Sequence, residues 1–132
     1  MNGLILDTSM AMEWFAMDPL PEALEKRALL DDHVVLVPHL WRFEVANVVW
    51  RWRRQEKITQ AGATWLLGEL MRLPFAIIDE GDPETIVNVA LAHDLSTYDA
   101  TYLHVAMTTG EPLATLDRQL QRAAESGGVA CL

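Results

Sequence analysis

The sequence is nearly free of cysteine and has no long uncharged apolar run, and both absences narrow the possible classes of protein. Its single cysteine, Cys131, has no partner for an internal disulfide, which is typical of a cytoplasmic protein. Its apolar stretches are broken by charged residues, whereas a membrane helix needs roughly twenty apolar residues in succession. We therefore predict a cytoplasmic protein with no membrane segment and no signal peptide.

Basic residues are also scarce. The chain has 10 Lys and Arg against 19 Asp and Glu, which gives a formal net charge of −9 and argues against broad, non-specific binding of nucleic acid. A local basic surface is still open, because the short stretch "WRWRRQEK" holds Arg51, Arg53, Arg54 and Lys57. The acidic excess has two explanations, ordinary solubility or a cluster of carboxylates around a cation.

Several well-known catalytic motifs are missing. No G-x-S-x-G is present to indicate a serine hydrolase, and no G-x-x-x-x-G-K-[ST] to indicate a nucleotide-binding loop. The 4 histidines are not spaced as paired metal ligands, so a zinc site built on them is not expected. Any catalytic activity of this chain therefore depends on side chains outside these motifs.

The alternation of apolar runs with amphipathic segments predicts an α/β fold in a single domain, residues 1–132. Short apolar runs predict strands at 3–7, 33–38, 74–79 and 111–117, with an edge strand at 129–132. The segments between them predict helices at 8–16, 21–32, 39–57, 59–73, 82–94, 96–110 and 118–128. Strands separated by helices favour a central parallel β-sheet flanked by helices on both faces.

Acidic residues follow two of these strands directly. Parallel α/β sheets bind ligands at the carboxyl ends of their strands, where Asp7 and Asp117 are expected to lie. Asp7 also suits the N-cap of the next helix, which is the plain structural explanation. Asp79 follows another strand, but its neighbours indicate an ordinary loop.

Two further acids lie on predicted helices. Glu44 is surrounded by apolar residues in "LWRFEVANVVW" and shares a helix face with Asn47, so its carboxylate needs either an arginine partner or a cation. Asp99 lies near a helix N-terminus, where a negative charge is favourable by itself. Ser96 or Thr97 can cap that helix, however, so Asp99 is not required as the cap.

Convergence of these acids would demand a cation. Two carboxylates about 5 Å apart repel by roughly 3 kcal/mol at an effective dielectric near 20. The candidate ligands are hard oxygens, which favour Mg²⁺ or Mn²⁺ over Zn²⁺. A divalent cation among carboxylates suits phosphodiester hydrolysis.

Four segments, in this order and spacing, resemble the PIN-domain family: "ILDTS", "FEVANVV", "LSTYDATYLHVA" and "PLATLDRQL". Within that family the chain is most similar to the VapC-type toxins of bacterial type II toxin–antitoxin pairs, along essentially its whole length. The resemblance implies a PIN-like fold and a homodimer. It also implies Mg²⁺- or Mn²⁺-dependent cleavage of RNA, and a cognate VapB-like antitoxin that blocks the site.

The resemblance also implies roles for individual residues. It assigns the catalytic metal ligands to four acids, Asp7, Glu44, Asp99 and Asp117. It assigns supporting roles to three polar side chains, Ser9, Asn47 and Thr115. The chain departs from the family at Asp94, where a glycine is common.

The basic stretch has several interpretations. A solvated helix face is the plain one, and tryptophans more often belong to a core or an interface than to an RNA-binding surface. In the toxin family this region commonly meets the antitoxin, and arginines can also bind phosphate. The candidate RNA or antitoxin contacts are Trp50, Trp52, Arg51, Arg53 and Arg54.

Two alternatives to a nuclease deserve comparison. A non-catalytic PIN-fold module that binds RNA or protein would not need all four acids. A phosphatase with Asp7 as nucleophile commonly has a second aspartate two residues later, where this chain has Ser9, and the chain shows no obvious catalytic lysine. The sequence therefore favours a metal-dependent endoribonuclease.

Overall fold

The computed structural model describes residues 2–132, and its centre is a sheet of parallel strands. The strands are β1 (Asn2–Leu6), β2 (His33–Pro38), β3 (Phe75–Ile78) and β4 (Leu113–Ala114), and they lie in the order β3-β2-β1-β4. The helices are α1 (Thr8–Trp14), α2 (Pro21–Arg27), α3 (Leu40–Arg54), α4 (Gln60–Met71), α5 (Pro83–His93), α6 (Thr97–Thr109) and α7 (Arg118–Ser126). The predicted α/β fold class is confirmed.

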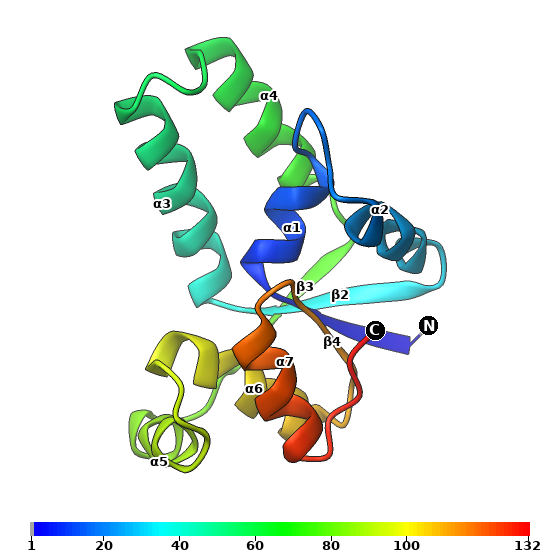
Figure 1. Cartoon of the computed structure of the whole chain (residues 1–132), viewed down its shortest axis with the longest axis vertical. Coiled ribbons are helices and arrows are strands. Elements are labelled where there is room, and N and C mark those ends of the chain that lie inside the picture. Colours follow the sequence, from blue (N-terminus) through cyan, green and yellow to red (C-terminus); the bar gives the residue numbers. More distant parts are fainter. Residues whose placement is uncertain (1) are drawn as a thin grey trace.

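Helices lie on both sides of the sheet (Figure 1). One side carries α1 and α2, together with the α3–α4 pair, which projects away from the body of the molecule. The other side carries α5, α6 and α7, and α6 packs directly against β1, β2 and β4. Such coverage of both faces explains why β1 has no polar side chain after Asn2, with Leu4, Ile5 and Leu6 fully buried.

Helix α6 is the most deeply embedded helix close to the site. Apart from its two ends, most of its side chains are buried, including Ala100, Tyr102, Leu103 and Val105. A helix that is apolar on most faces is fixed by packing on several sides. Polar side chains carried by α6 therefore occupy positions set by the core of the protein.

The predicted elements differ from the observed ones mainly at their ends. The predicted helix 21–32 divides into α2 and a 3₁₀ turn, η1 (Ala28–Asp31), because a tighter turn is a common way to end a helix. Residues 129–132 contribute only a parallel bridge between Leu113 and Cys131, since β4 itself is very short. Thr59 caps α4 as predicted. Within residues 2–132, no helix has the combination of length and apolarity needed to cross a bilayer.

Candidate functional site

The site lies where β1 and β4 end side by side. From β1 the chain continues toward β2 on one side, whereas β4 lies on the other side, so a crevice opens between their carboxyl ends. Asp7 follows the last residue of β1, and Thr115 follows the last residue of β4. Asp117 then occupies the N-cap position of α7. The fold thus brings the first and last predicted acids to one edge of the sheet.

Asp7 occupies the N-cap position of α1, but its side chain makes no capping hydrogen bond. Its Oδ2 instead accepts hydrogen bonds from Ser9 Oγ at 2.9 Å and from Thr115 Oγ1 at 2.6 Å. Burial raises the pKa of Asp7, and the nearby charge of Asp117 adds to that effect, although the two hydroxyls oppose it. Plain capping does not account for Asp7, because its carboxylate turns inward to the crevice.

Glu44 comes from the second turn of α3 and faces Asp7. Its Oε1 accepts hydrogen bonds from the Tyr102 hydroxyl and from Thr8 Oγ1. Burial raises the pKa of Glu44, and the charge of Asp7 raises it further. No arginine forms an ion pair with Glu44 in residues 2–132, so the structural alternative of an arginine partner is wrong.

Asp99 lies in the first turn of α6 with a carboxylate that is not used as a cap. Ser96 caps the helix, as predicted, by accepting a hydrogen bond from the Asp99 backbone N–H at 3.1 Å. Burial raises the pKa of Asp99 to about 6, and the charges of Asp117, Asp7 and Glu44 contribute. Four carboxylates from four separate segments therefore lie within reach of one another's electric field.

Asp117 combines capping with a place in this cluster. Its Oδ1 accepts hydrogen bonds from the backbone N–H groups of Gln119 at 2.9 Å and Leu120 at 3.0 Å, which caps α7. Its second oxygen, Oδ2, has no hydrogen bond within the described part of the chain. One oxygen of Asp117 is thus fixed by the helix, and the other is available to a ligand.

The donor set fits a small, hard divalent cation. None of the four acids forms an ion pair in residues 2–132, and all four offer carboxylate oxygens. Asp7, Glu44 and Asp117 each have one oxygen tied by hydrogen bonds and a second one left over. Among the described residues, no three Asp, Glu, His or Cys side chains are already close enough together to hold a metal ion, so binding of a cation would require these carboxylates to move closer to one another.

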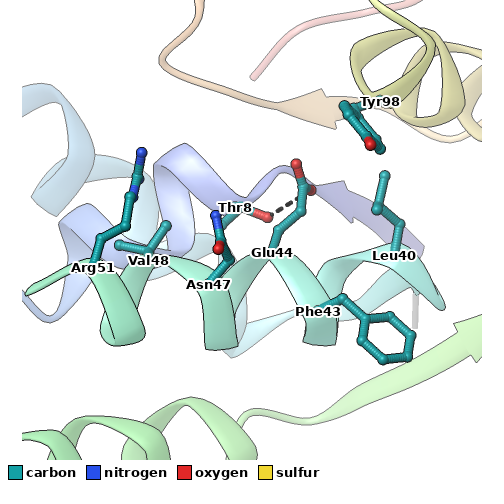
Figure 2. Close-up of a pocket in the computed structure, with 8 residues that line it drawn as sticks. All are labelled: Thr8, Leu40, Phe43, Glu44, Asn47, Val48, Arg51 and Tyr98. Atoms are coloured by element: carbon teal, nitrogen blue, oxygen red, sulfur yellow. Dashed lines mark hydrogen bonds between the residues drawn. The ribbon is translucent and has the colours of Figure 1, made fainter. Parts of the chain in front are cut away.

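A groove of about 510 Å³ runs along α3 beside Glu44 (Figure 2). Asn47 and Arg51 follow Glu44 along the helix and give this part of the groove a polar wall, with Asn47 on the predicted face. Beyond Glu44 the wall is apolar, formed by Leu40 and by the exposed ring of Tyr98. Along the groove, Glu44 therefore lies between Arg51 on one side and the ring of Tyr98 on the other.

The other candidates from the basic stretch lie elsewhere. Arg53 donates a hydrogen bond to the Ile58 carbonyl at 3.2 Å, and Arg54 stacks on the exposed ring of Trp50 at 5.5 Å. Trp52 is half-buried and lines a separate apolar groove. Of the five predicted contacts, only Arg51 lies in the groove that contains Glu44.

Sequence reasoning missed two residues that contact Glu44, Thr8 and Tyr102. The sequence held one usable signal for Tyr102, its position three residues after Asp99 on the same helix face. Asp94 has a left-handed backbone with φ of 53°, which explains the preference for glycine there. Asp94 is not among the charges that shift the pKa of Asp99.

Comparison with known proteins agrees with this architecture. Residues 4–126 match the model of the PIN domain family. Ribonuclease VapC3 of Pyrobaculum aerophilum is 30% identical over 120 residues, which are 89% of this chain and 91% of that protein. Exonuclease VapC9 of the same organism is 30% identical over 82 residues, which are 62% of this chain and 61% of that protein.

Solved structures share the fold at lower identity. PAE2754 from Pyrobaculum aerophilum superposes with a TM-score of 0.75 at 22% identity, covering 98% of this chain and 83% of that one. FitAcB from Neisseria gonorrhoeae gives 0.71 at 18% identity, with 98% and 96% covered. VapBC2 from Rickettsia felis, bound to a promoter DNA fragment, gives 0.70 at 12% identity, with 98% and 97% covered.

Proposed function

Because the chain belongs to the PIN domain family, we propose that it is a Mg²⁺- or Mn²⁺-dependent endoribonuclease and the toxin of a type II toxin–antitoxin pair. The observation that carries the proposal is the cluster of four carboxylates at one edge of the sheet with no ion-pair partner in residues 2–132. The similar proteins named VapC are a ribonuclease and an exonuclease, which favours a nuclease over a binding module.

Asp7, Glu44, Asp99 and Asp117 would hold the cation between them. A bound Mg²⁺ or Mn²⁺ would supply an activated water and neutralise charge on the phosphate. Ser9 and Thr115 keep the carboxylate of Asp7 in one orientation, since both hydroxyls donate to its Oδ2.

The groove beside Glu44 supplies the contacts for RNA. Arg51 offers a positive charge to the phosphate backbone, and Asn47 offers a neutral polar group nearer to Glu44. Among the described residues, Arg51 is the one Lys or Arg side chain that lines this groove, so binding of RNA there depends strongly on Arg51. We expect this action in the cytoplasm.

Metal dependence of RNA cleavage tests the proposal. Protein stripped of metal should leave RNA intact and should cut it when Mg²⁺ or Mn²⁺ is returned. Attack by water, rather than by the RNA 2′-hydroxyl, leaves a 3′-hydroxyl and a 5′-phosphate, which sequencing of the RNA ends detects. Metal-independent cleavage, or 2′,3′-cyclic phosphate ends, would contradict the mechanism. RNA binding without cleavage would favour the non-catalytic module.

The antitoxin has a candidate surface away from the acids. An apolar groove of about 490 Å³ lies between the end of α1 and the tip of the α3–α4 pair, and its lining includes Phe15, Trp52 and Trp65. Trp65 is 58% exposed, which is unusual for so large an apolar side chain. We infer that a cognate VapB-like antitoxin places apolar side chains there.

Replacement of Trp65 should separate antitoxin binding from RNA cleavage. Trp65→Ala removes an exposed aromatic anchor, and loss of about 2 kcal/mol corresponds to roughly 30-fold weaker antitoxin binding. The matched control is Trp50→Ala, because Trp50 is 56% exposed but lies outside that groove. Titration calorimetry with the antitoxin measures the difference, and equal losses in both variants would argue against this surface.

A second copy of the chain has a different surface available. Exposed apolar side chains line a pocket of about 330 Å³ between α3, α5 and α6, among them Val87 and Tyr98, and the exposed Leu91 lies one helical turn after Val87 on α5. Contiguous exposed apolar area is typical of an interface between proteins. We infer that the homodimer forms through this face.

A further inference from the structure

Two hydroxyl groups from distant parts of the chain meet on one oxygen of Glu44. The Tyr102 hydroxyl lies 2.5 Å from Glu44 Oε1, and Thr8 Oγ1 lies 3.0 Å from the same atom. The two hydroxyl oxygens are themselves 3.0 Å apart. Three helices, α1, α3 and α6, therefore converge on a single carboxylate oxygen.

The proton count at this contact allows both hydroxyls to donate to Glu44. A threonine or tyrosine hydroxyl carries one proton, and an ionised carboxylate only accepts. Both protons can therefore point at Oε1 together, which leaves Oε2 as the one oxygen of Glu44 without a hydrogen bond in the described residues. Burial and the charge of Glu44 raise the pKa of Tyr102, so this hydroxyl keeps its proton.

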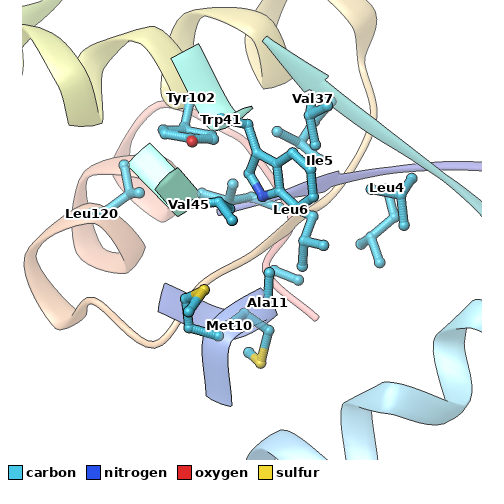
Figure 3. Close-up of a cluster of buried hydrophobic side chains, with 14 of the residues drawn as sticks. Leu4, Ile5, Leu6, Met10, Ala11, Val37, Trp41, Val45, Tyr102 and Leu120 are labelled. Carbon is cyan, nitrogen blue, oxygen red and sulfur yellow. The ribbon is translucent and has the colours of Figure 1, made fainter. Parts of the chain in front are cut away.

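Both donors are held by the core of the protein. Tyr102 is fully buried in the same cluster as Trp41 and Val45 (Figure 3), and Thr8 is 7% exposed. Neither side chain can turn away without disturbing its surroundings. Thr8 directly follows Asp7, and Tyr102 lies one helical turn after Asp99, so the contact ties Glu44 to the backbone that carries two other acids.

We propose that Thr8 and Tyr102 are positioning residues that hold Glu44 by Oε1 and direct Oε2 toward the cation site. This inference rests on the proposed function, because it assumes a cation among the four acids. It differs from simple satisfaction of a half-buried carboxylate, which would affect the stability of the fold and leave the affinity for metal unchanged.

The test is Mn²⁺ binding to the full chain, measured by calorimetry or by the electron paramagnetic resonance signal of free Mn²⁺. Tyr102→Phe and Thr8→Val each remove one hydroxyl and keep the shape of the side chain. Loss of a group that orients a metal ligand typically weakens metal binding 10- to 100-fold, and we expect a value in that range for Tyr102→Phe.

Thr101→Val is the matched control for Thr8→Val. Thr101 is also buried, but its hydroxyl donates to the Thr97 carbonyl on the same helix at 2.7 Å and contacts no acid. Its replacement should leave the affinity for Mn²⁺ unchanged. Thermal melting without metal shows whether each variant is folded, so a loss of affinity is not mistaken for unfolding.

Combination with Glu44→Ala shows whether Tyr102 acts through Glu44. In that background the addition of Tyr102→Phe should weaken Mn²⁺ binding no further, because the carboxylate it orients is gone. If the wild-type chain binds Mn²⁺ and Tyr102→Phe binds it equally well, the positioning role is wrong and the proposed function stands. If the wild-type chain binds no Mn²⁺, the proposed function itself fails, and this inference fails with it.

Discussion

Asp7→Asn should reduce Mg²⁺-dependent RNA cleavage by more than about a hundredfold. Loss of a group that only hydrogen-bonds to a metal ligand typically lowers metal affinity or activity 10- to 100-fold, and Asp7 is itself a proposed ligand. Asp7 is the most buried of the four acids. Asparagine keeps its shape, and its carbonyl oxygen can still accept the hydrogen bonds from Ser9 and Thr115. The substitution therefore removes a negative charge with little disturbance of the surrounding packing. Single-turnover cleavage of an RNA oligonucleotide measures the effect.

The chain offers a matched control in Asp79→Asn. Asp79 also follows a parallel strand directly, at the end of β3, but it is exposed, and its Oδ1 accepts only from the Gly81 backbone N–H at 2.9 Å. It does not contribute to the shifted pKa of Asp99. Asp79→Asn should therefore cleave RNA like the wild-type chain. Equal activity of the wild-type chain and Asp7→Asn would show that Asp7 has no catalytic role.

Stability without metal separates chemistry from folding in the same variant. Burial raises the pKa of Asp7, which means that the folded protein disfavours its charge. Asp7→Asn should therefore melt at the same or a higher temperature than the wild-type chain at pH 7 without metal. An inactive variant that melts much earlier would indicate a damaged fold instead of a missing ligand.

The architecture was predictable because its helices and strands have clear patterns of apolar residues and clear caps. Within β1, residues 3–6 have no polar side chain since both faces of the sheet are covered, and Thr59 and Ser96 mark helix starts with caps that the structure confirms. The division of the second predicted helix at residue 28 was not predictable, because a 3₁₀ turn and an α-helix share the same amphipathic pattern at their ends.

The site was predictable in its acids and much less so in what surrounds them. From the sequence, Asp7 suits two roles, the cap of a helix and a ligand of a metal ion. The two roles are distinguished by the hydrogen bonds that its carboxylate accepts from Ser9 and Thr115, which are seen only in the structure. The contact between Thr8 and Tyr102 joins residues that are 94 positions apart. Local periodicity carries no information about such a pair, because tertiary packing alone brings them together.

The basic stretch illustrates a second limit. Five neighbouring residues on a helix point in five directions about 100° apart, so their functions separate once the helix packs. Arg51 lines the groove beside Glu44, whereas Trp52 lines the apolar groove and Arg53 donates to the Ile58 carbonyl between α3 and α4. A run of basic and aromatic letters therefore predicts several surfaces at once instead of one binding patch.

Without metal, the stability of the protein should fall as the pH rises through about 6. Burial, followed by the charges of Asp117, Asp7 and Glu44, raises the pKa of Asp99 from 3.8 to about 6. The folded chain therefore keeps a proton that the unfolded chain releases at lower pH. The stabilisation from this group is complete below pH 3.8 and is lost as the pH passes through about 6. The pKa values of Asp7 and Glu44 are shifted in the same direction.

A divalent cation should reverse this trend, because it binds the deprotonated carboxylates. Mg²⁺ or Mn²⁺ at a hundred times its dissociation constant stabilises the fold by about 2.7 kcal/mol, or roughly 10 °C in Tm for a domain of this size. We expect that rise at pH 8 and a much smaller one at pH 5, measured by calorimetry at matched ionic strength. Asp7→Asn should remove most of the rise at pH 8, with Mg²⁺ and with Mn²⁺ alike. An equal rise at both pH values would mean that the cation binds somewhere other than among these protonatable acids, since competition with protons is what links its affinity to Asp99.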